Sequence, residues 1–142
     1  MPAAWDLSDF YLSAMLEAML NVIATGGDLT MALYKNDYAP VPGSELADFT
    51  EADFPGYVSQ LIGSTDFGAP TVTDHVASSV SGVVLTFVGD PGTWTPQTIY
   101  GYFVTDWNSD YFFAEKFSVP IDMSPDGEIR VTPRLRHQNL PV

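Results

Sequence analysis

Near the N-terminus, polar residues recur every four positions within an otherwise apolar stretch. From position 9 onward these polar residues are Asp9, Ser13, Glu17 and Asn21. The spacing places their side chains in one narrow stripe of a helix, and Gly26-Gly27 supplies a stop after it. Asp6 or Ser8 is suited to cap the first turn. The pattern predicts one helix over residues 7–25.

The predicted helix is apolar around most of its circumference. A helix that lies on its own domain needs an apolar arc of only ~100° or somewhat more. We therefore expect part of this surface to contact another chain, through the side chains Phe10, Tyr11, Met15 and Met19. The alternative is a helix that is buried between a sheet and a loop of its own domain.

After Gly27 the apolar period changes from helical to two. Leu29, Met31 and Leu33 predict a strand that ends at the turn-rich residues 36–43. Further strands are predicted over residues 57–62, 81–88, 99–105, 111–117 and 128–135. The turn at residues 106–110 predicts a hairpin. These short strands without βαβ alternation indicate a mainly β chain: an antiparallel β-sandwich or jelly-roll-like domain preceded by one N-terminal α-helix.

Composition supports one folded domain over residues 1–142, with the helix as its oligomerisation or docking element. The chain is 46% hydrophobic and 16% charged, and its formal net charge is −13. That charge repels nucleic acid and anionic lipid, so we expect neither as a partner. The absence of Cys excludes disulfides and thiol nucleophiles. The N-terminus lacks the basic and apolar regions of a signal peptide, and the apolar stretch is too interrupted to span a membrane.

No pattern in the sequence predicts catalysis, a metal or a cofactor. Asp106, Asn108 and Asp110 copy the first half of a calcium loop, but Tyr111 replaces the required Gly and Phe117 the bidentate Glu. The acidic cluster Glu45, Asp48, Glu51 and Asp53 lies beside a Pro-Gly turn, which is typical of a solvated loop. The two histidines, His75 and His137, show no triad spacing.

Arginines are concentrated near the C-terminus. In residues 128–136 the apolar side chains alternate with Arg130, Arg134 and Arg136, which hold three of the five cations of the chain. Alternation predicts that these arginines share one strand face. Carboxylates of the same sheet neutralise them, or they bind an acidic partner; both readings stay open. Pro133 places the strand at an edge or a bulge.

Two sequence blocks carry a resemblance. The first is ADFTEADFPGY, residues 47–57, and the second is YGYFVTD, residues 100–106; the later FAEKF, residues 113–117, accompanies them. Over residues 29–135 the chain resembles small β-rich bacteriophage virion structural proteins, of the capsid cement, decoration or tail-associated type. The resemblance implies localisation in the virion, on the outer shell or tail, with other virion proteins, chiefly the major capsid protein, as partners. By analogy with jelly-roll virion proteins, a homotrimer is the expected oligomer.

Aromatic residues in the predicted loops support two interpretations. In the first, the protein is a capsid cement or decoration subunit, and Phe49, Phe54, Tyr57, Trp94 and Trp107 are loop anchors. In the second, it is an adhesin-type binding module of the tail, baseplate or fibre, and the two tryptophans offer platforms to a sugar.

Overall fold

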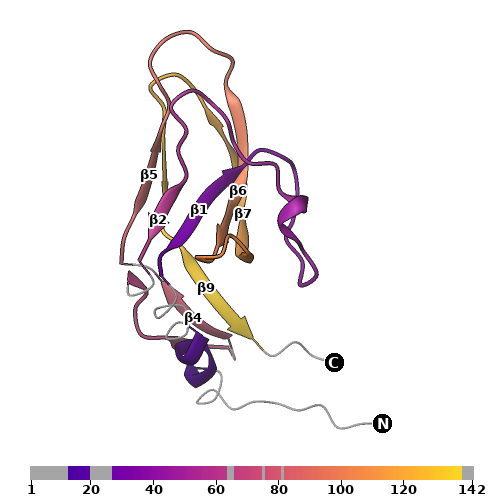
Figure 1. Cartoon of the computed structure of the whole chain (residues 1–142), viewed down its shortest axis with the longest axis vertical. Helices are drawn as coiled ribbons and strands as arrows, with labels where there is room; N and C mark the ends of the chain where they lie inside the picture. Colours follow the sequence, from indigo (N-terminus) through magenta and orange to yellow (C-terminus); the bar gives the residue numbers. More distant parts are fainter. Residues whose placement is uncertain (1–12, 20–26, 64–65, 75, 81, 139–142) are drawn as a thin grey trace. The chain divides into compact units, whose positions relative to one another are not determined.

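The computed structural model describes residues 13–19, 27–63, 66–74, 76–80 and 82–138 (Figure 1). The chain divides into two compact units. Unit 1 comprises residues 1–27, 63–84 and 132–142, and unit 2 comprises residues 28–62 and 85–131. The described part is mainly β, with antiparallel sheets and one helix, as the sequence predicts.

Unit 2 contains two antiparallel sheets. The larger sheet has the strand order β2-β1-β6-β7 and the smaller pairs β5 with β8. Their bounds are β1 Leu29–Tyr34, β2 Gln60–Ile62, β5 Leu85–Val88, β6 Gln97–Thr105, β7 Tyr111–Met123 and β8 Glu128–Val131. The predicted hairpin is present, because β6 and β7 pair on either side of residues 106–110.

The two faces of the four-stranded sheet differ in composition. Alternate residues of β1 and its neighbours form the core face, whose side chains are 0–2% exposed: Leu29, Met31, Leu33, Ile62, Tyr102 and Val104. The opposite face, here called the aromatic face, carries Ala32, Tyr34 and Phe103. Both faces are therefore buried in part, which explains why β1 reads as an almost continuous apolar run.

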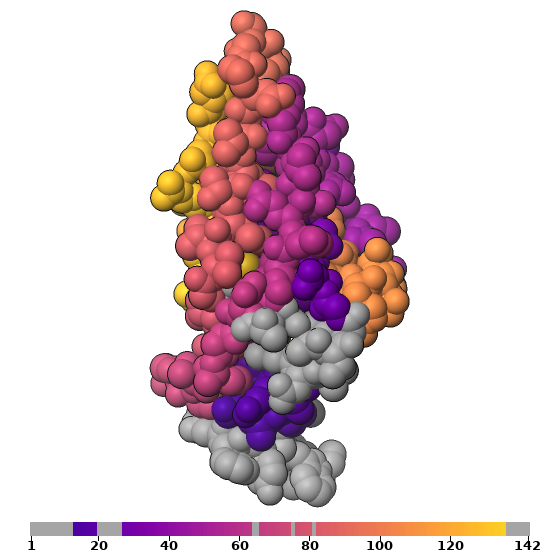
Figure 2. All heavy atoms as spheres, turned by 60° about the vertical axis from the view of Figure 1, so that its left-hand side comes forward, coloured from indigo at the N-terminus to yellow at the C-terminus, as the bar shows by residue number. Residues whose placement is uncertain are grey.

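The two sheets of unit 2 are in contact along β2 and β5. The Gln60 side-chain amide donates to the Thr86 carbonyl, and the Tyr57 ring stacks on Phe87 with centroids 6.1 Å apart. The segments of β2 and β5 lie side by side in Figure 1 and in the turned view of Figure 2. The buried side chains of the smaller sheet are Leu85, Phe87, Ile129 and Val131.

Strand β7 is longer than predicted and irregular. Its register against β6 shifts between Val104 and Thr105 and again between Ile99 and Gly101. Pro120 lies within the second irregular stretch, where β7 has no registered partner in β6. A bulge tolerates Pro because its missing N–H interrupts no regular ladder there.

Unit 1 combines a helical segment with a three-stranded antiparallel sheet. Residues 13–19 are helical, and the rest of the predicted helix, residues 7–12 and 20–25, lies outside the described residues. The sheet has the order β3-β4-β9, with bounds Thr71–Thr73, Val76–Val80 and Arg134–Gln138. Asp74, with a φ of 50°, stands in the short turn between β3 and β4.

The predicted single strand over residues 128–135 is wrong. The structure has two strands there, β8 in unit 2 and β9 in unit 1, separated by Thr132 and Pro133. Proline has no backbone N–H, so it ends the β8 ladder and lets the chain pair with a different sheet. Arg130 consequently belongs to one sheet, whereas Arg134 and Arg136 belong to another, so the predicted common strand face does not form.

Candidate functional site

A covering segment, residues 35–51, lies over part of the aromatic face of the sheet. It leaves β1 and returns to it: Lys35 N donates to Thr50 O at 2.8 Å, and Ala52 N donates to Leu33 O at 2.8 Å. Its short 3-10 helix η1 spans Leu46–Asp48. The backbone of the segment is thus tied to the strand at both of its ends.

Phe49 joins the covering segment to the sheet. Its ring stacks on Phe103 of β6, with centroids 5.2 Å apart and planes at 24°. It also meets Tyr34 of β1 edge-on at 5.1 Å and stacks on Tyr111 of β7 at 5.4 Å. Aromatic pairs at these separations are worth ~0.5–1.5 kcal/mol each beyond the area they bury. Phe49 is therefore the main apolar contact of the covering segment.

Polar side chains close the covering segment on itself. Asn36 donates from Nδ2 to Asp48 O at 2.8 Å and accepts from Thr50 N at 2.7 Å. The Tyr38 hydroxyl and the Ser44 hydroxyl are hydrogen-bonded at 2.7 Å. The two bonds of Asn36 satisfy backbone groups that have no strand partner, which stabilises the conformation of the covering segment.

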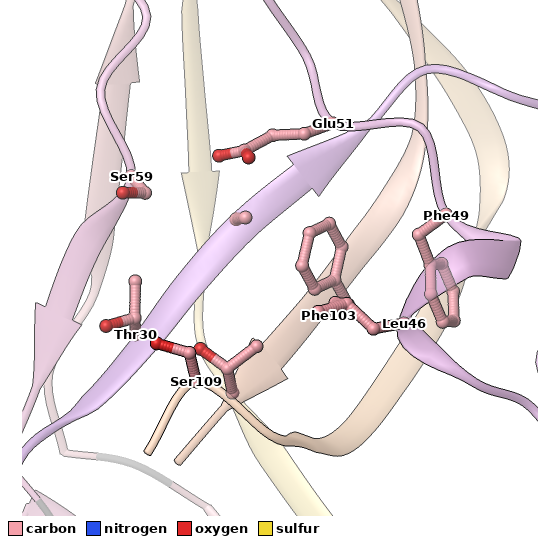
Figure 3. Close-up of a pocket in the computed structure, with 9 residues that line it drawn as sticks. Thr30, Leu46, Phe49, Glu51, Ser59, Phe103 and Ser109 are labelled. Carbon is pink, nitrogen blue, oxygen red and sulfur yellow. The ribbon is translucent and has the colours of Figure 1, made fainter. Parts of the chain in front are cut away.

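Beside Phe49 the covering segment leaves a pocket of about 270 Å³ on the sheet (Figure 3). Every residue that lines it belongs to unit 2: Thr30, Ala32, Leu46, Phe49, Glu51, Ser59, Phe103, Thr105 and Ser109. The register explains the floor, because Thr30 pairs with Thr105 and Ala32 pairs with Phe103 across β1 and β6. The pocket thus combines four hydroxyls and one carboxylate with apolar and aromatic side chains.

The Glu51 carboxylate is held in place by Tyr57. The Tyr57 hydroxyl donates to Glu51 Oε1 at 2.9 Å and accepts from Leu33 N at 3.1 Å. Burial raises the pKa of Tyr57 well above its ordinary value, and the neighbouring Glu51 carboxylate adds to the increase. Tyr57 therefore stays a neutral hydrogen-bond donor to Glu51 at any physiological pH.

Ser109 is positioned by the turn between β6 and β7. Asp106 Oδ1 accepts from the backbone N–H groups of Asn108 and Asp110, both at 2.9 Å. Ser109 lies between them with a φ of 66°, in the left-handed region. The Asp106 carboxylate thus organises the turn in the manner of an Asx-turn. In the sequence, Asp106 belonged to the incomplete calcium-loop pattern.

Asp48 and Asp53, two members of the acidic cluster in the sequence, bind separate partners. Asp48 Oδ2 accepts from Glu45 N at 2.8 Å, and Asp53 Oδ1 accepts from Lys35 at 2.8 Å and Gln97 at 2.6 Å. The hydrogen bond from Lys35, followed by that from Gln97, lowers the pKa of Asp53. Within the described ranges, no group of three or more acidic or histidine side chains is arranged to hold a metal ion.

Four of the five predicted anchors lie within aromatic contacts of unit 2. Phe49 contacts the sheet, while Phe54 contacts Tyr57 edge-on at 5.3 Å and stacks on Trp94 at 6.1 Å. The Trp94 indole donates to Asp90 O at 3.1 Å. Trp107 differs from these residues, because its side chain is 40% exposed in the 106–110 turn.

The other predicted contact residues are distributed over both units. Arg130 pairs with Glu128 of its own strand, and Arg134 is exposed in β9. Arg136 pairs in register with Ser78 of β4. Met15 and Met19 are 42% and 38% exposed. Phe10 and Tyr11 lie outside the described residues.

The pocket itself was missed by sequence reasoning. Its hydroxyl residues come from β1, from the approach to β2, from β6 and from the β6–β7 turn. Only Glu51 belonged to a cluster considered for chemistry. The one local signal is Thr30, a polar residue inside the apolar strand β1. It indicates a pocket only once Thr30 is known to pair with Thr105 of β6.

Comparisons with known proteins gave no match: no protein-family model, curated protein or solved structure matches the chain.

Proposed function

We propose that the protein is a structural subunit of a bacteriophage particle, of the capsid cement or decoration type, which stabilises the shell through protein–protein contacts. The proposal assigns the fold to the antiparallel β-sandwich or jelly-roll class. It is supported by the two blocks of the resemblance, since Phe49 of the first block stacks on Phe103 of the second. These blocks build the framework of unit 2, which fits a structural role.

The observation that carries the proposal is the exposure of aliphatic side chains on the two edge strands. β2 and β7 form the edges of the four-stranded sheet. Leu61 on β2 is 66% exposed, and Val119 on β7 is 70% exposed. Aliphatic side chains exposed at a sheet edge favour association with another chain. On β7 this applies to the stretch around Val119 and Ile121, because the strand also carries Glu115, Lys116 and Asp122. A subunit that contacts neighbours on two sides is suited to a shell.

Acidity sets the position within the particle. Unit 2 holds 13 of the 18 carboxylates and three of the five cations of the chain. A surface of this sign repels packaged nucleic acid, which favours a place on the outside of the shell or on the tail. In the described part of the chain no helix is long and apolar enough to cross a bilayer.

The proposed assembly is a homo-oligomer, preferably a trimer, in which the helical segment contacts its copies. Leu16 is fully buried, whereas Met15 and Met19 remain exposed on the same helix. The double variant M15E/M19E should dissociate the oligomer in light scattering at micromolar concentration. A full-length protein that is already a monodisperse monomer would exclude this assembly.

Copy number tests the function directly. Particles purified by density gradient would be labelled with antibodies against this protein and quantified by mass spectrometry. A cement subunit is expected in a fixed ratio to the major capsid protein and labels the whole shell. Absence from purified particles would refute the virion role, and label confined to the tail would move the protein there.

The arginines test how the subunit attaches. Because Arg130 lies on β8, in a different sheet from Arg134 and Arg136 of β9, charge reversal there is the control for the double variant R134E/R136E. Co-sedimentation with protein-stripped shells should fail for the double variant and persist for R130E, because breaking a buried interfacial charge pair costs about 2–5 kcal/mol or more. Equal binding by both would place the contact elsewhere.

A second candidate function is an adhesin-type binding module of the tail, baseplate or fibre. The pocket favours it, since four hydroxyls and Glu51 converge there beside two Phe rings. Trp94 is less suited to the role of a sugar platform, because its ring stacks on Phe54. Label at the tail tip, at a few copies per particle, is the result expected of an adhesin.

A further inference from the structure

We propose that the pocket between the covering segment and the four-stranded sheet binds one neutral pyranose unit of a glycan. The inference goes beyond assembly, because it concerns the isolated subunit and holds on the shell or on the tail. It rests on the polar groups, the apolar wall, the size and the charge of the pocket.

The polar groups of the pocket match those of a sugar. Hydroxyls both donate and accept, and a carboxylate offers about four acceptor positions. In Figure 3, Thr30 and Ser109 lie together at one end, and the Glu51 carboxylate points across the other end in the direction of Ser59. Since Tyr57 donates to only one oxygen of Glu51, the carboxylate retains acceptor capacity for hydroxyl groups of a ligand.

The apolar wall suits the C–H face of a pyranose ring. Leu46, Phe49 and Phe103 line the pocket beside Ala32 of β1. Ligand sites of this kind combine apolar and aromatic walls with a few placed polar groups. A volume of about 270 Å³ has room for roughly nine waters at ~30 Å³ each, which suits a single sugar ring rather than an extended peptide.

Charge excludes an anionic ligand. None of the described residues that line the pocket is a cation. Each cation of unit 2 has a carboxylate partner in that unit, Lys35 with Asp53, Lys116 with Asp37 and Arg130 with Glu128. A phosphate or an acidic sugar would therefore meet Glu51 without compensation, whereas a neutral sugar uses Glu51 as an acceptor.

The walls of the pocket are preorganised. The Asp106 carboxylate holds the turn of Ser109, Asn36 closes the covering segment, and Tyr57 orients Glu51. Side chains already held by the protein lose little freedom when a ligand binds. A single sugar ring in an open pocket is still expected to bind only in the millimolar range.

The test is an NMR titration of the full chain, labelled with ¹⁵N, against methyl glycosides of glucose, galactose, mannose and N-acetylglucosamine. At least one glycoside should give saturable shifts at the backbone amides of Thr30, Ser59, Thr105 and Ser109. Methyl glucuronide and ethylammonium are the anionic and cationic comparison probes, and both should bind more weakly than that glycoside.

Variants locate the binding. T105V removes a hydroxyl and keeps the shape of the side chain, and E51Q removes the charge but keeps an acceptor for Tyr57. Each variant should weaken glycoside binding about tenfold, which is the contribution of one good hydrogen bond to the affinity. T86V is the matched control, because Thr86 lies on β5 and does not line the pocket. S59A provides a second hydroxyl deletion, in a loop, if T105V fails to fold.

Three outcomes would overturn the proposal. The first is that no neutral glycoside gives saturable shifts at the pocket amides. The second is that ethylammonium or methyl glucuronide binds as tightly as the best neutral glycoside. The third is that a folded T105V or S59A binds like the wild type or like T86V.

Discussion

The two faces of the four-stranded sheet are buried in different ways. The core face consists of side chains such as Leu29, Met31 and Val104, all fully buried. The aromatic face is covered by a single loop, whose main apolar contact is Phe49. The aromatic face retains a pocket, about 270 Å³ in volume.

The difference teaches how a loop shapes a binding surface. Strands and their side chains interdigitate densely and leave few voids. A loop has to satisfy its own backbone groups with polar side chains such as Asn36 and Ser44, so it cannot follow the sheet closely everywhere. The incomplete cover leaves Thr30 and Thr105 accessible at the pocket, although they belong to β1 and β6, the two central strands of the sheet.

The largest expected effect is the loss of the Phe49 ring. We expect F49A to lower the free energy of unfolding by about 3–5 kcal/mol, because the ring contacts Tyr34, Phe103 and Tyr111. L33A on the core face is the matched variant, expected at about 2–5 kcal/mol. Urea denaturation measures both. A loss below about 1 kcal/mol for F49A would mean that the covering segment is not part of the cooperative fold.

Gly101 tests how closely the aromatic face is packed. A Cβ at this position would lie 2.6 Å from the Tyr34 hydroxyl oxygen and would also collide with Glu115 O of β7. We expect G101A to destabilise the protein by about 1–3 kcal/mol. G43A is the control, since a Cβ there meets nothing within 4 Å and the effect should stay within ~0.5 kcal/mol. Thermal unfolding of the two variants compares them; equal melting temperatures would contradict the packing.

Asn36 tests the polar closure of the covering segment. N36A removes the bonds to Asp48 O and from Thr50 N and should cost about 1–3 kcal/mol, at ~0.5–1.5 kcal/mol for each bond. N108A removes a turn amide outside the covering segment and serves as the comparison. Amide hydrogen exchange should show faster exchange at Thr50 in N36A only. Unchanged protection there would show that the apolar contact of Phe49 alone holds the loop.

Alkaline pH should distinguish the tyrosines of the aromatic face. Burial raises the pKa of Tyr34 and of Tyr111 above the ordinary value of about 10. The folded state favours the neutral phenol. The contribution of this buried phenol to the free energy of unfolding is therefore complete below about pH 10 and is lost as the pH rises toward the folded-state pKa. Denaturant titrations on both sides of about pH 10 should show this loss, and Y34F should make it shallower. An identical pH dependence in Y34F would assign the loss to other tyrosines.

Regular hydrophobic alternation predicted much of unit 2. The strand at Leu29–Tyr34, the β6–β7 hairpin and the start of β8 follow from local patterns. β3 and β4 were not predicted, because Thr71–Thr73 and Val76–Val80 are short, and Ser78 and Ser79 weaken the alternation in β4. Pro133 was interpreted as a mark of an edge strand or a bulge, whereas the chain changes sheets there.

Local sequence patterns could not predict the pocket, for a different reason. Thr30 and Thr105 meet because β1 and β6 pair in one particular register, and Ser109 joins them through the turn that Asp106 organises. A register shifted by one residue would place the two threonines on opposite faces of the sheet. Long-range pairing of this kind cannot be inferred from one sequence, whereas the anchoring role predicted for Phe49 needed only the spacing of aromatic residues.

The route of the chain has a consequence for synthesis on the ribosome. The chain passes between the two units four times, at residues 27–28, 62–63, 84–85 and 131–132. The four-stranded sheet needs β7, and the sheet of unit 1 gains its third strand only when β9 has emerged. Neither unit can therefore complete its sheet during translation of the first hundred or so residues. Until β9 has been synthesised, β4 has one edge without a partner strand. Slow translation would lengthen the time for which that edge is open to another nascent chain.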